Sequence, residues 1–216
     1  MIKFENTEVM NFEGALRGMR NPLNSWDKSD SAFIGEPGYQ SYIGSYDLSL
    51  AQRLIKAGSD HRKFMRQIFV SVDITAPLYW WKEFDTYKVA TVANSCSTMH
   101  TIHKKEFALA DFSHEWISNL DKFYDKGTPG GALVETVVML NKCRRLYLET
   151  KDKEYWYQMI QLLPSSYNQM RTVTLNYETL RNIYFARRNH KLDEWRNGFI
   201  EWIDSLPYAE ELIKYQ

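Results

Sequence analysis

The chain has 216 residues, of which 44% are hydrophobic and 15% aromatic, so its length and composition support a folded core and exclude disorder over most of the sequence. Its 27 basic and 27 acidic residues cancel to a net charge of zero, which argues against a dedicated binder of nucleic acids or membrane surfaces. Two cysteines are too few for a disulfide framework, and neither a secretory leader nor an apolar stretch of membrane-spanning length is recognisable, so we expect a cytoplasmic protein.

The N-terminal half is predicted to contain a short strand, a long loop, a helix and a strong strand. Residues 2–12 alternate apolar with charged side chains, whereas residues 21–46 are rich in Pro, Gly, Ser, Asn and Asp and predict a long loop. Asp47 is a suitable N-cap for a helix that ends near Gly58. Residues 68–75 alternate between apolar and polar positions, which is the clearest strand pattern in the chain.

The C-terminal part is predicted to be mainly helical, with one further strand. The expected elements are an aromatic helix that begins at Pro77, a small polar loop with strand-forming ends over 89–101, a helix capped by Asp111 or Ser113 that ends near Gly127, helices over 133–148 and 153–163, a strand over 170–176, and helices over 177–188 and 192–206. No internal repeat or linker interrupts them. We therefore expect a single α+β domain over residues 1–216, in which a central β-sheet is flanked by long helices and residues 21–46 form a loop insertion.

Several familiar catalytic motifs are absent from the sequence. It contains no glycine-rich loop for a nucleoside triphosphate or a dinucleotide, and no nucleophile elbow of the serine hydrolases. His100 and His103 have the spacing of a metal-binding pair, but without further ligands we interpret them as polar loop residues and expect no metal. Cys96 lies between two serines, a setting that suits a thiolate nucleophile or, more commonly, a small structural cysteine. No catalytic residue is assigned.

Two groups of side chains have the chemistry to bind a nucleotide. One is the cationic cluster that precedes the strong strand, composed of His61, Arg62, Lys63 and Arg66. This cluster can hold a phosphate or form a solvated surface, and the sequence leaves both interpretations open. The other is the aromatic run over residues 79–81, Tyr-Trp-Trp, which offers flat surfaces for stacking a flavin or a base. Core packing explains such a run more often than ligand stacking does.

A third polar set surrounds the last predicted junction between a strand and a helix. Asn176 stands at the junction, where its carboxamide can cap the helix or contact the edge of a ligand ring. Asn182 and Arg187 follow on the helix and, from their spacing, lie about 140° apart around its axis. Both can therefore contact one ligand only in a broad cleft or between two subunits. Arg188 adds a second cation at the end of this helix.

Read in order, residues 48–205 resemble the flavin-dependent thymidylate synthases, the family of thymidylate synthases that use FAD. The first similar patch, ITAPLYWWKEFDTYKVAT over residues 74–91, resembles the strand, Ala-Pro and helix that precede the family's signature motif. The second patch is Leu-Leu-Pro over 162–164 followed by TLNYETLRNIYFARR over 174–188. It resembles the family's Leu-Pro and its Asn-x-Arg-x-Leu-x-Asn pattern with a terminal arginine.

The resemblance implies an activity and a set of site residues. The activity is methylation of dUMP to dTMP with FAD as cofactor and with NADPH and methylenetetrahydrofolate as co-substrates, in sites formed between subunits of a homotetramer. Carried over by position, the flavin contacts are His61, Lys88, Asn176 and Asn182. The contacts of the nucleotide substrate are Glu83, Cys96, Ser97, Arg187 and Arg188. The two arginines compete for one role beside the pyrimidine ring. We expect neither a nucleic acid nor a membrane as a partner.

The chain departs from the family's pattern at several charged positions. The signature Arg-His-Arg falls on residues 86–88, Thr-Tyr-Lys, and the later Ser-x-Arg falls on residues 96–98, Cys-Ser-Thr. The arginine of Asn-x-Arg is Glu178 here. Because each lost contact to a phosphate costs a few kcal/mol, either other cations rebuild the site or the ligand has changed. The candidates for rebuilding it are His61, Arg62, Lys63 and Arg171.

Three functions are compatible with these observations. The first is FAD-dependent methylation of dUMP. The second is a closely related flavin-dependent modification of a pyrimidine nucleotide, which the lost phosphate contacts favour. The third is a non-catalytic nucleotide-binding or structural protein that keeps the fold and the tetramer. The flavin content of the purified protein separates the third function from the other two.

Overall fold

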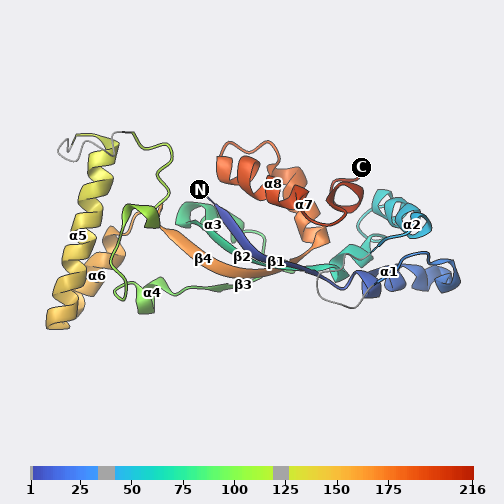
Figure 1. The fold of residues 1–216 in the computed structure, drawn as a ribbon, viewed down its shortest axis with the longest axis horizontal. Helices are drawn as coiled ribbons and strands as arrows, with labels where there is room; N and C mark the ends of the chain where they lie inside the picture. The colour runs from blue at the N-terminus through green and yellow to red at the C-terminus, as the bar shows by residue number, and fades with distance from the viewer. Residues whose placement is uncertain (1, 34–41, 119–126) are drawn as a thin grey trace. The chain divides into compact units, whose positions relative to one another are not determined.

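The computed structural model describes residues 2–33, 42–118 and 127–216, which have a mixed α+β fold (Figure 1). A four-stranded antiparallel sheet has the strand order β1-β2-β4-β3. The strands are β1 (Lys3–Met10), β2 (Phe69–Pro77), β3 (Val92–Ser95) and β4 (Asn168–Asn176). The α-helices are α1 (Phe12–Arg20), α2 (Ser45–Lys56), α3 (Leu78–Phe84), α4 (Thr98–Thr101), α5 (Pro129–Thr150), α6 (Lys153–Leu162), α7 (Tyr177–Arg187) and α8 (Ile200–Asp204). Within the described ranges, none of the helices combines the length and apolar composition needed to span a bilayer.

Strand β2 forms as its alternating sequence predicts. Val70, Val72 and Ile74 are buried, and the polar residues between them are only partly so. The amide of Tyr177, just after β4, donates to the carbonyl of Ile68, just before β2, at 3.0 Å. This pairing runs the two strands in opposite directions, as expected for neighbours in an antiparallel sheet.

The chain divides into two compact units. The first unit comprises Met1–Lys3, Ile74–Thr86 and Asn94–Arg171. The second unit comprises Phe4–Asp73, Tyr87–Ala93 and Thr172–Gln216. Strands β2 and β4 therefore contribute residues to both units, and each unit has its own set of helices.

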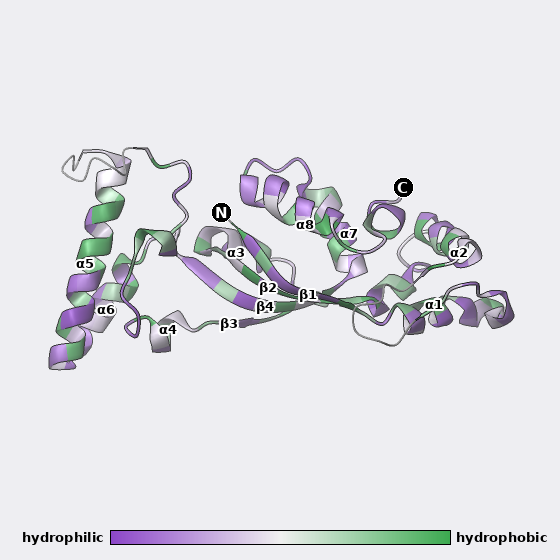
Figure 2. Ribbon diagram, viewed as in Figure 1, coloured by the Kyte–Doolittle hydropathy of each residue, from purple (hydrophilic) through white to green (hydrophobic). Residues whose placement is uncertain are grey.

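In the first unit, helices α5 and α6 lie side by side (Figure 1). Hydrophobic and hydrophilic residues alternate along α5, so that one side of it can be buried (Figure 2). This helix is longer than the predicted 133–148, because Pro129 suits its first turn and the Thr128 hydroxyl accepts the amide hydrogen of Gly131 at 3.1 Å. Asp152 caps α6 as predicted. The core that these helices cover includes Ile102, Phe107, Phe112, Leu140 and Met159.

The helix predicted to begin at Asp111 or Ser113 is not formed in residues 112–118. Instead, the amide of Ser113 donates to the carbonyl of Ser166 at 2.8 Å. Phe112 has an extended backbone and forms an antiparallel bridge with Tyr167, so pairing with a distant segment replaces the helix that the local capping signal predicts. Leu120, which belonged to the same predicted helix, lies outside the described residues.

The chain after β2 is organised differently from the prediction. Helix α3 follows Pro77 as expected, but it ends at Phe84 instead of continuing towards residue 88. Part of the predicted loop over 89–101 forms strand β3 and the short helix α4. The amide of Cys96 donates to the carbonyl of Met170 at 3.0 Å, which holds the end of β3 beside β4.

In the second unit, aromatic side chains of the C-terminal helices form much of the core. Trp195 and Phe199 are buried, with their ring centroids 5.3 Å apart. The ring of Trp202 stacks on that of Phe4 in β1, with centroids 5.0 Å apart. The helix predicted over 192–206 is confirmed in position, although its first part is a π-helical segment that leads into α8.

Helix α2 begins two residues before the predicted N-cap. Gly44 occupies the N-cap position, and Asp47 lies inside the first turn with its side chain buried. The carboxylate of Asp47 binds Nε of Arg20 at 2.5 Å and accepts hydrogen bonds from two serine hydroxyls of the preceding loop at 2.6 Å each. The described part of the predicted 21–46 loop contains two short 3₁₀ helices, over residues 21–23 and 26–28. Its serine hydroxyls hold the loop to α2 through Asp47.

Candidate functional site

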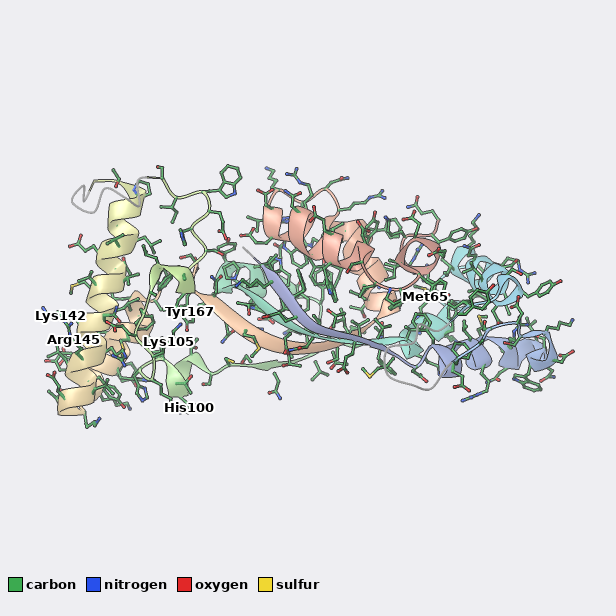
Figure 3. All side chains as sticks on the ribbon, viewed as in Figure 1. Met65, His100, Lys105, Lys142, Arg145 and Tyr167 are labelled. Atoms are coloured by element: carbon green, nitrogen blue, oxygen red, sulfur yellow. The ribbon has the colours of Figure 1, made fainter. Side chains whose placement is uncertain are left out.

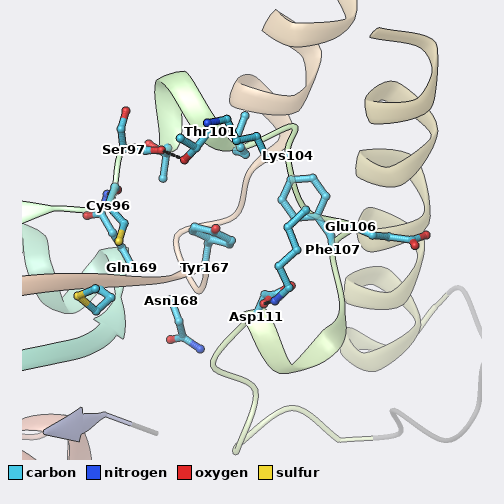
Figure 4. Close-up of a pocket in the computed structure, with 14 residues that line it drawn as sticks. Cys96, Ser97, Thr101, Lys104, Glu106, Phe107, Asp111, Tyr167, Asn168 and Gln169 are labelled. Carbon is cyan, nitrogen blue, oxygen red and sulfur yellow. Dashed lines mark hydrogen bonds and ion pairs between the residues drawn. The ribbon is translucent and has the colours of Figure 1, made fainter. Parts of the chain in front are cut away.

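The first unit contains a pocket of about 280 Å³ between residues 96–111 and the start of β4 (Figure 4). Two of the predicted substrate contacts, Cys96 and Ser97, line this pocket. So do Lys104 and Tyr167, which the sequence analysis did not single out. They lie on segments that are remote from each other in the chain, so no local sequence pattern indicates that they line the same pocket. We call this cavity the Cys96 pocket.

The Cys96 pocket is lined by two lysines, Lys104 and Lys105, and by two carboxylates, Glu106 and Asp111. Nζ of Lys105 lies 2.7 Å from Oδ1 of Asp111, and this hydrogen bond raises the pKa of Lys105, which therefore stays charged. Burial, and then the charge of Asp111, raise the pKa of Tyr167, so its phenol stays protonated and can donate a hydrogen bond. Figure 3 labels Lys105 and Tyr167, and both residues line the pocket. Within the described ranges, Lys104 forms no ion pair with a carboxylate.

The main chain of the Cys96 pocket is held in place by side chains. The carboxamide of Gln169 donates to the carbonyl of Cys96 at 2.9 Å. The hydroxyl of Ser97 accepts the amide hydrogen of His100 at 3.1 Å and so caps helix α4. Ser97 therefore has a structural role in addition to any contact with a ligand, whereas the Cys96 side chain is exposed.

Other predicted groups of the first unit are already engaged within the protein. Nη1 of Arg171 lies 2.7 Å from Oδ1 of Asp85, and its guanidinium lies 4.2 Å from the ring centroid of Trp81. Trp80 and Trp81 are buried, so these two rings pack in the core and offer no platform to a flavin. Glu83 is half-buried on α3 and lies close to its C-terminal end.

In the second unit, two aromatic side chains position Arg187. Its Nε donates to the hydroxyl of Tyr87 at 2.6 Å. Its guanidinium lies 5.5 Å from the ring centroid of Tyr87 and 5.4 Å from that of Trp195, within the range of cation–π attraction. Tyr87 occupies the middle position of the signature segment that the family resemblance placed at 86–88. That position is the sequence feature that could have identified Tyr87 as a candidate site residue.

Arg187 and Arg188 have different surroundings. The guanidinium of Arg188 lies over the ring of Phe185, 5.1 Å from its centroid, and the residue is exposed. Arg187 instead joins α7 to the signature segment through Tyr87. The hydroxyl of Thr179, also on α7, donates to the carbonyl of Val89, which directly follows that segment, at 3.2 Å. Of the two arginines, Arg187 is thus the one that shares a cluster with the signature segment.

The three remaining flavin-side predictions on or near α7 differ in exposure. The carboxamide oxygen of Asn176 accepts the amide hydrogen of Thr179 at 2.9 Å, so the capping role left open by the sequence is confirmed. Asn176 is 3% exposed, and only its carboxamide nitrogen is left to meet a ligand. Asn182 and Lys88 are both exposed.

The cationic cluster before β2 is split by tertiary contacts. Nε of Arg62 binds both carboxylate oxygens of Glu178 on α7, at 3.1 and 2.9 Å. Nη2 of Arg66 donates to the carbonyl of Ser59 at 3.0 Å. His61 and Lys63 instead line a second cavity of about 440 Å³. In the part of the chain that the structure describes, no group of three or more His, Cys, Asp or Glu residues is placed to hold a metal ion.

Taken as a whole, the chain has the fold of the flavin-dependent thymidylate synthases. It is similar to a crystal structure of thymidylate synthase X from Helicobacter pylori with FAD and dUMP, with a TM-score of 0.67, 17% identity, and coverage of 98% of this chain and 95% of that one. A further crystal structure, of the flavin-dependent thymidylate synthase from Helicobacter pylori in complex with FAD and dUMP, has the same TM-score and identity and covers 100% and 97%. No family model matches the sequence, and no curated protein matches it either.

Proposed function

We propose that the chain is a flavin-dependent enzyme that methylates dUMP to dTMP or carries out a closely related modification of a pyrimidine nucleotide. The observation that supports this proposal best is the nearly full-length likeness to structures that contain FAD and dUMP. NADPH and methylenetetrahydrofolate are the proposed co-substrates, and a cytoplasmic homotetramer is the proposed assembly. The protein's contribution is to bind and orient the ligands.

On the flavin side, exposed residues fit the proposed cofactor better than buried ones. Lys88 and Asn182 are accessible and can supply a cation to a phosphate and a carboxamide to a ring edge. His61 is accessible in its own cavity. Asn176 fits only through its carboxamide nitrogen, because its oxygen caps α7. FAD, when bound, supplies the redox chemistry that these side chains lack.

On the nucleotide side, we propose two substrate contacts, each within one unit: Arg187 as a pyrimidine contact in the second unit, and the Cys96 pocket as a phosphate contact in the first unit. The stacking of Arg187 against Tyr87 fixes the direction of its guanidinium before a ligand arrives, which lowers the entropic cost of binding. The arginine missing from residues 96–98 is replaced in this proposal by Lys104, which lines the same pocket as Cys96. Arg62 and Arg171 are weaker replacements, because each is bound to a carboxylate. Glu83, Ser97 and Arg188 remain proposed substrate contacts.

One observation favours the alternative of a non-catalytic nucleotide-binding or structural protein. Glu178 occupies the position where the family carries an arginine, and its carboxylate is bound by Arg62. An internal ion pair at that position removes a cation from ligand binding and stabilises the start of α7 instead. This alternative predicts a folded protein that binds no flavin.

The proposal is tested first by the flavin content of the purified protein. We expect about one FAD per chain after incubation with the cofactor, with the absorption spectrum of a bound flavin. Asn182→Ala is expected to weaken FAD binding about fivefold, which is the effect of losing one hydrogen bond of roughly 1 kcal/mol. Asn197→Ala, an exposed asparagine on another helix, serves as the matched control and is expected to bind FAD normally.

Each result of the flavin experiment has a definite meaning. A protein that takes up no FAD rules out both enzymatic functions and leaves the nucleotide-binding alternative. If FAD binds, release of tritium from dUMP labelled at carbon 5 identifies methylation of dUMP. FAD binding without tritium release points to a different reaction on a related nucleotide.

The proposed role of Lys104 is tested by comparing a nucleotide with its nucleoside. Lys104→Ala is expected to weaken dUMP binding by about tenfold to a hundredfold, since a charge-assisted contact to a phosphate is worth roughly 1.5–3 kcal/mol. Deoxyuridine, which lacks the phosphate, is expected to bind both proteins equally in calorimetric titrations. Lys142→Ala is the control, because Lys142 lies on α5 and does not line the Cys96 pocket (Figure 3). Unchanged dUMP affinity in Lys104→Ala would place the phosphate elsewhere.

A further inference from the structure

The first unit carries a cluster of basic side chains on two segments that are far apart in the sequence. One segment consists of α4 and the residues that follow it, and the other is the middle of α5. Neither residues 92–105 nor residues 136–148 include an aspartate or a glutamate. The cluster, which we call the α4–α5 cationic surface, consists of His100, Lys104, Lys105, Lys142, Arg144 and Arg145.

Hydrogen bonds between side chains and the main chain hold the two segments side by side. Nε of Arg144 donates to the carbonyl of His103 at 2.9 Å. The carboxamide of Asn141 accepts the amide hydrogen of Phe107 at 2.9 Å and donates to the carbonyl of the same residue at 2.8 Å. The segment between His103 and Phe107, which carries two of the lysines, therefore runs alongside this turn of α5 (Figure 3).

The positive charges of the α4–α5 cationic surface are only partly balanced. Residues 98–111 and 141–145 contain five Lys and Arg side chains and two carboxylates, Glu106 and Asp111, which leaves a surplus of three positive charges. Lys105 forms an ion pair with Asp111 at 2.7 Å, and the other four form no ion pair with a carboxylate within the described ranges. Like charges that are held close together repel one another and attract polyanions. Because the net charge of the whole chain is zero, this surplus is a local feature.

Aromatic rings border the α4–α5 cationic surface. The ring of Tyr147 on α5 packs edge-on against that of His103, with centroids 5.1 Å apart. The indole nitrogen of Trp156 on α6 donates to the carbonyl of Met99 in α4 at 3.1 Å. Both aromatic residues are partly exposed. Rings beside cations are the combination on which unpaired nucleobases stack while the cations contact the phosphates. An acidic peptide has carboxylates for the cations but no series of bases for the rings.

We propose that the α4–α5 cationic surface binds single-stranded nucleic acid through its phosphates, without reading a particular sequence. The surplus of positive charge suits the backbone of the strand, and the bordering rings suit its unstacked bases. The zero net charge led to the expectation of no nucleic-acid partner, but a net charge does not describe how the charges are distributed. The inference goes beyond the proposed function, because Lys142 and Arg145 do not line the Cys96 pocket.

The test is fluorescence anisotropy of a labelled oligo(dT) of about 20 nucleotides titrated with the full chain. We expect a dissociation constant of about 10⁻⁶–10⁻⁴ M near physiological salt, and a slope of log affinity against log salt of about −3, as for about four phosphate contacts. The double variant Lys142→Ala/Arg145→Ala is expected to weaken binding about tenfold or more and to reduce the slope by about 1.4. Lys3→Ala/Lys82→Ala removes two exposed lysines of the same unit outside the surface and is expected to bind as the parent does.

A competition with dUMP separates this surface from the proposed substrate contacts. Saturating dUMP is expected to leave the oligonucleotide bound, and Lys142→Ala/Arg145→Ala is expected to keep the parent's affinity for dUMP. Displacement of the oligonucleotide by dUMP, equal affinity in the parent and the double variant, or no binding below about 1 mM overturns the inference. Tighter binding of poly-L-glutamate than of the oligonucleotide also overturns it and assigns the surface to an acidic protein. Failure of FAD uptake refutes the proposed function without affecting oligonucleotide binding.

Discussion

Replacing Asp47 by alanine is expected to lower the free energy of unfolding by about 3–5 kcal/mol, because it leaves the Arg20 guanidinium buried without its counter-charge. The side chains of Arg20 and Asp47 are 4% and 0% exposed, and Nε lies 2.5 Å from Oδ1. The hydroxyls of Ser29 and Ser31 lose their acceptor in the same variant. Urea denaturation followed by circular dichroism measures the change.

The control for this variant is an ion pair on the surface of the same unit. Glu13 and Arg17 form a pair at 3.8 Å in which both side chains are 66% exposed. Glu13→Ala is expected to change the free energy of unfolding by less than about 0.5 kcal/mol. A loss of less than about 1 kcal/mol in Asp47→Ala would mean that the buried pair contributes little to the stability of the second unit.

The same carboxylate predicts how stability depends on pH. Burial raises the pKa of Asp47, but hydrogen bonds from Ser29, Ser31 and Arg20 outweigh this effect and lower it below the ordinary value of 3.8. An aspartate with a lowered pKa contributes stability that is fully present above the pKa of the unfolded chain. That contribution is lost as the pH falls through the lower pKa of the folded protein. Acid denaturation of Asp47→Ala should therefore show a weaker dependence on pH below about pH 4.

Replacing Arg187 by alanine is expected to weaken dUMP binding by about tenfold to a hundredfold, the effect of removing a charged donor of roughly 1.5–3 kcal/mol. Arg188→Ala is expected to have little effect, because that guanidinium lies over Phe185 and makes no contact with the signature segment. Tyr87→Phe keeps the ring and removes the hydroxyl that holds Nε of Arg187 at 2.6 Å, so a smaller loss is expected. Calorimetric titration with dUMP gives the three affinities.

Thermal unfolding of each of the three variants, compared with the parent, separates an effect on ligand binding from an effect on folding. A fourth variant, Arg187→Lys, keeps a positive charge without the planar donor geometry of arginine. We expect Arg187→Lys to recover part of the affinity lost in Arg187→Ala. Equal affinities of the parent and Arg187→Ala would remove Arg187 from the site, and a loss confined to Arg188→Ala would assign the role to Arg188.

The candidate site could be predicted from the sequence only where its residues are close in the chain. Asn176 and Asn182 became candidates because they belong to one strand-to-helix segment, and the capping role of Asn176 follows from its position at the helix start. Lys104 was not a candidate, because nothing in its sequence neighbourhood indicates that it lines the same pocket as Tyr167. Arg62 and Arg171 were candidates as replacement cations, but the carboxylates of Glu178 and Asp85 that engage them are distant in sequence.

The sequence by itself determined a strand predicted over 68–75 and observed as β2, the presence of helices α5, α6 and α7, and the caps at Asp152 and Asn176. These features depend on periodic burial and on hydrogen bonds within a few residues, which a local pattern records completely. Only the tertiary structure decided that Asp47 is buried against Arg20, that residues 112–118 are not helical, and which cations stay available to a ligand. The physical reason is that a charged or capping side chain can pair with any group of suitable charge or hydrogen-bonding type. The folded chain determines which of these groups is within reach.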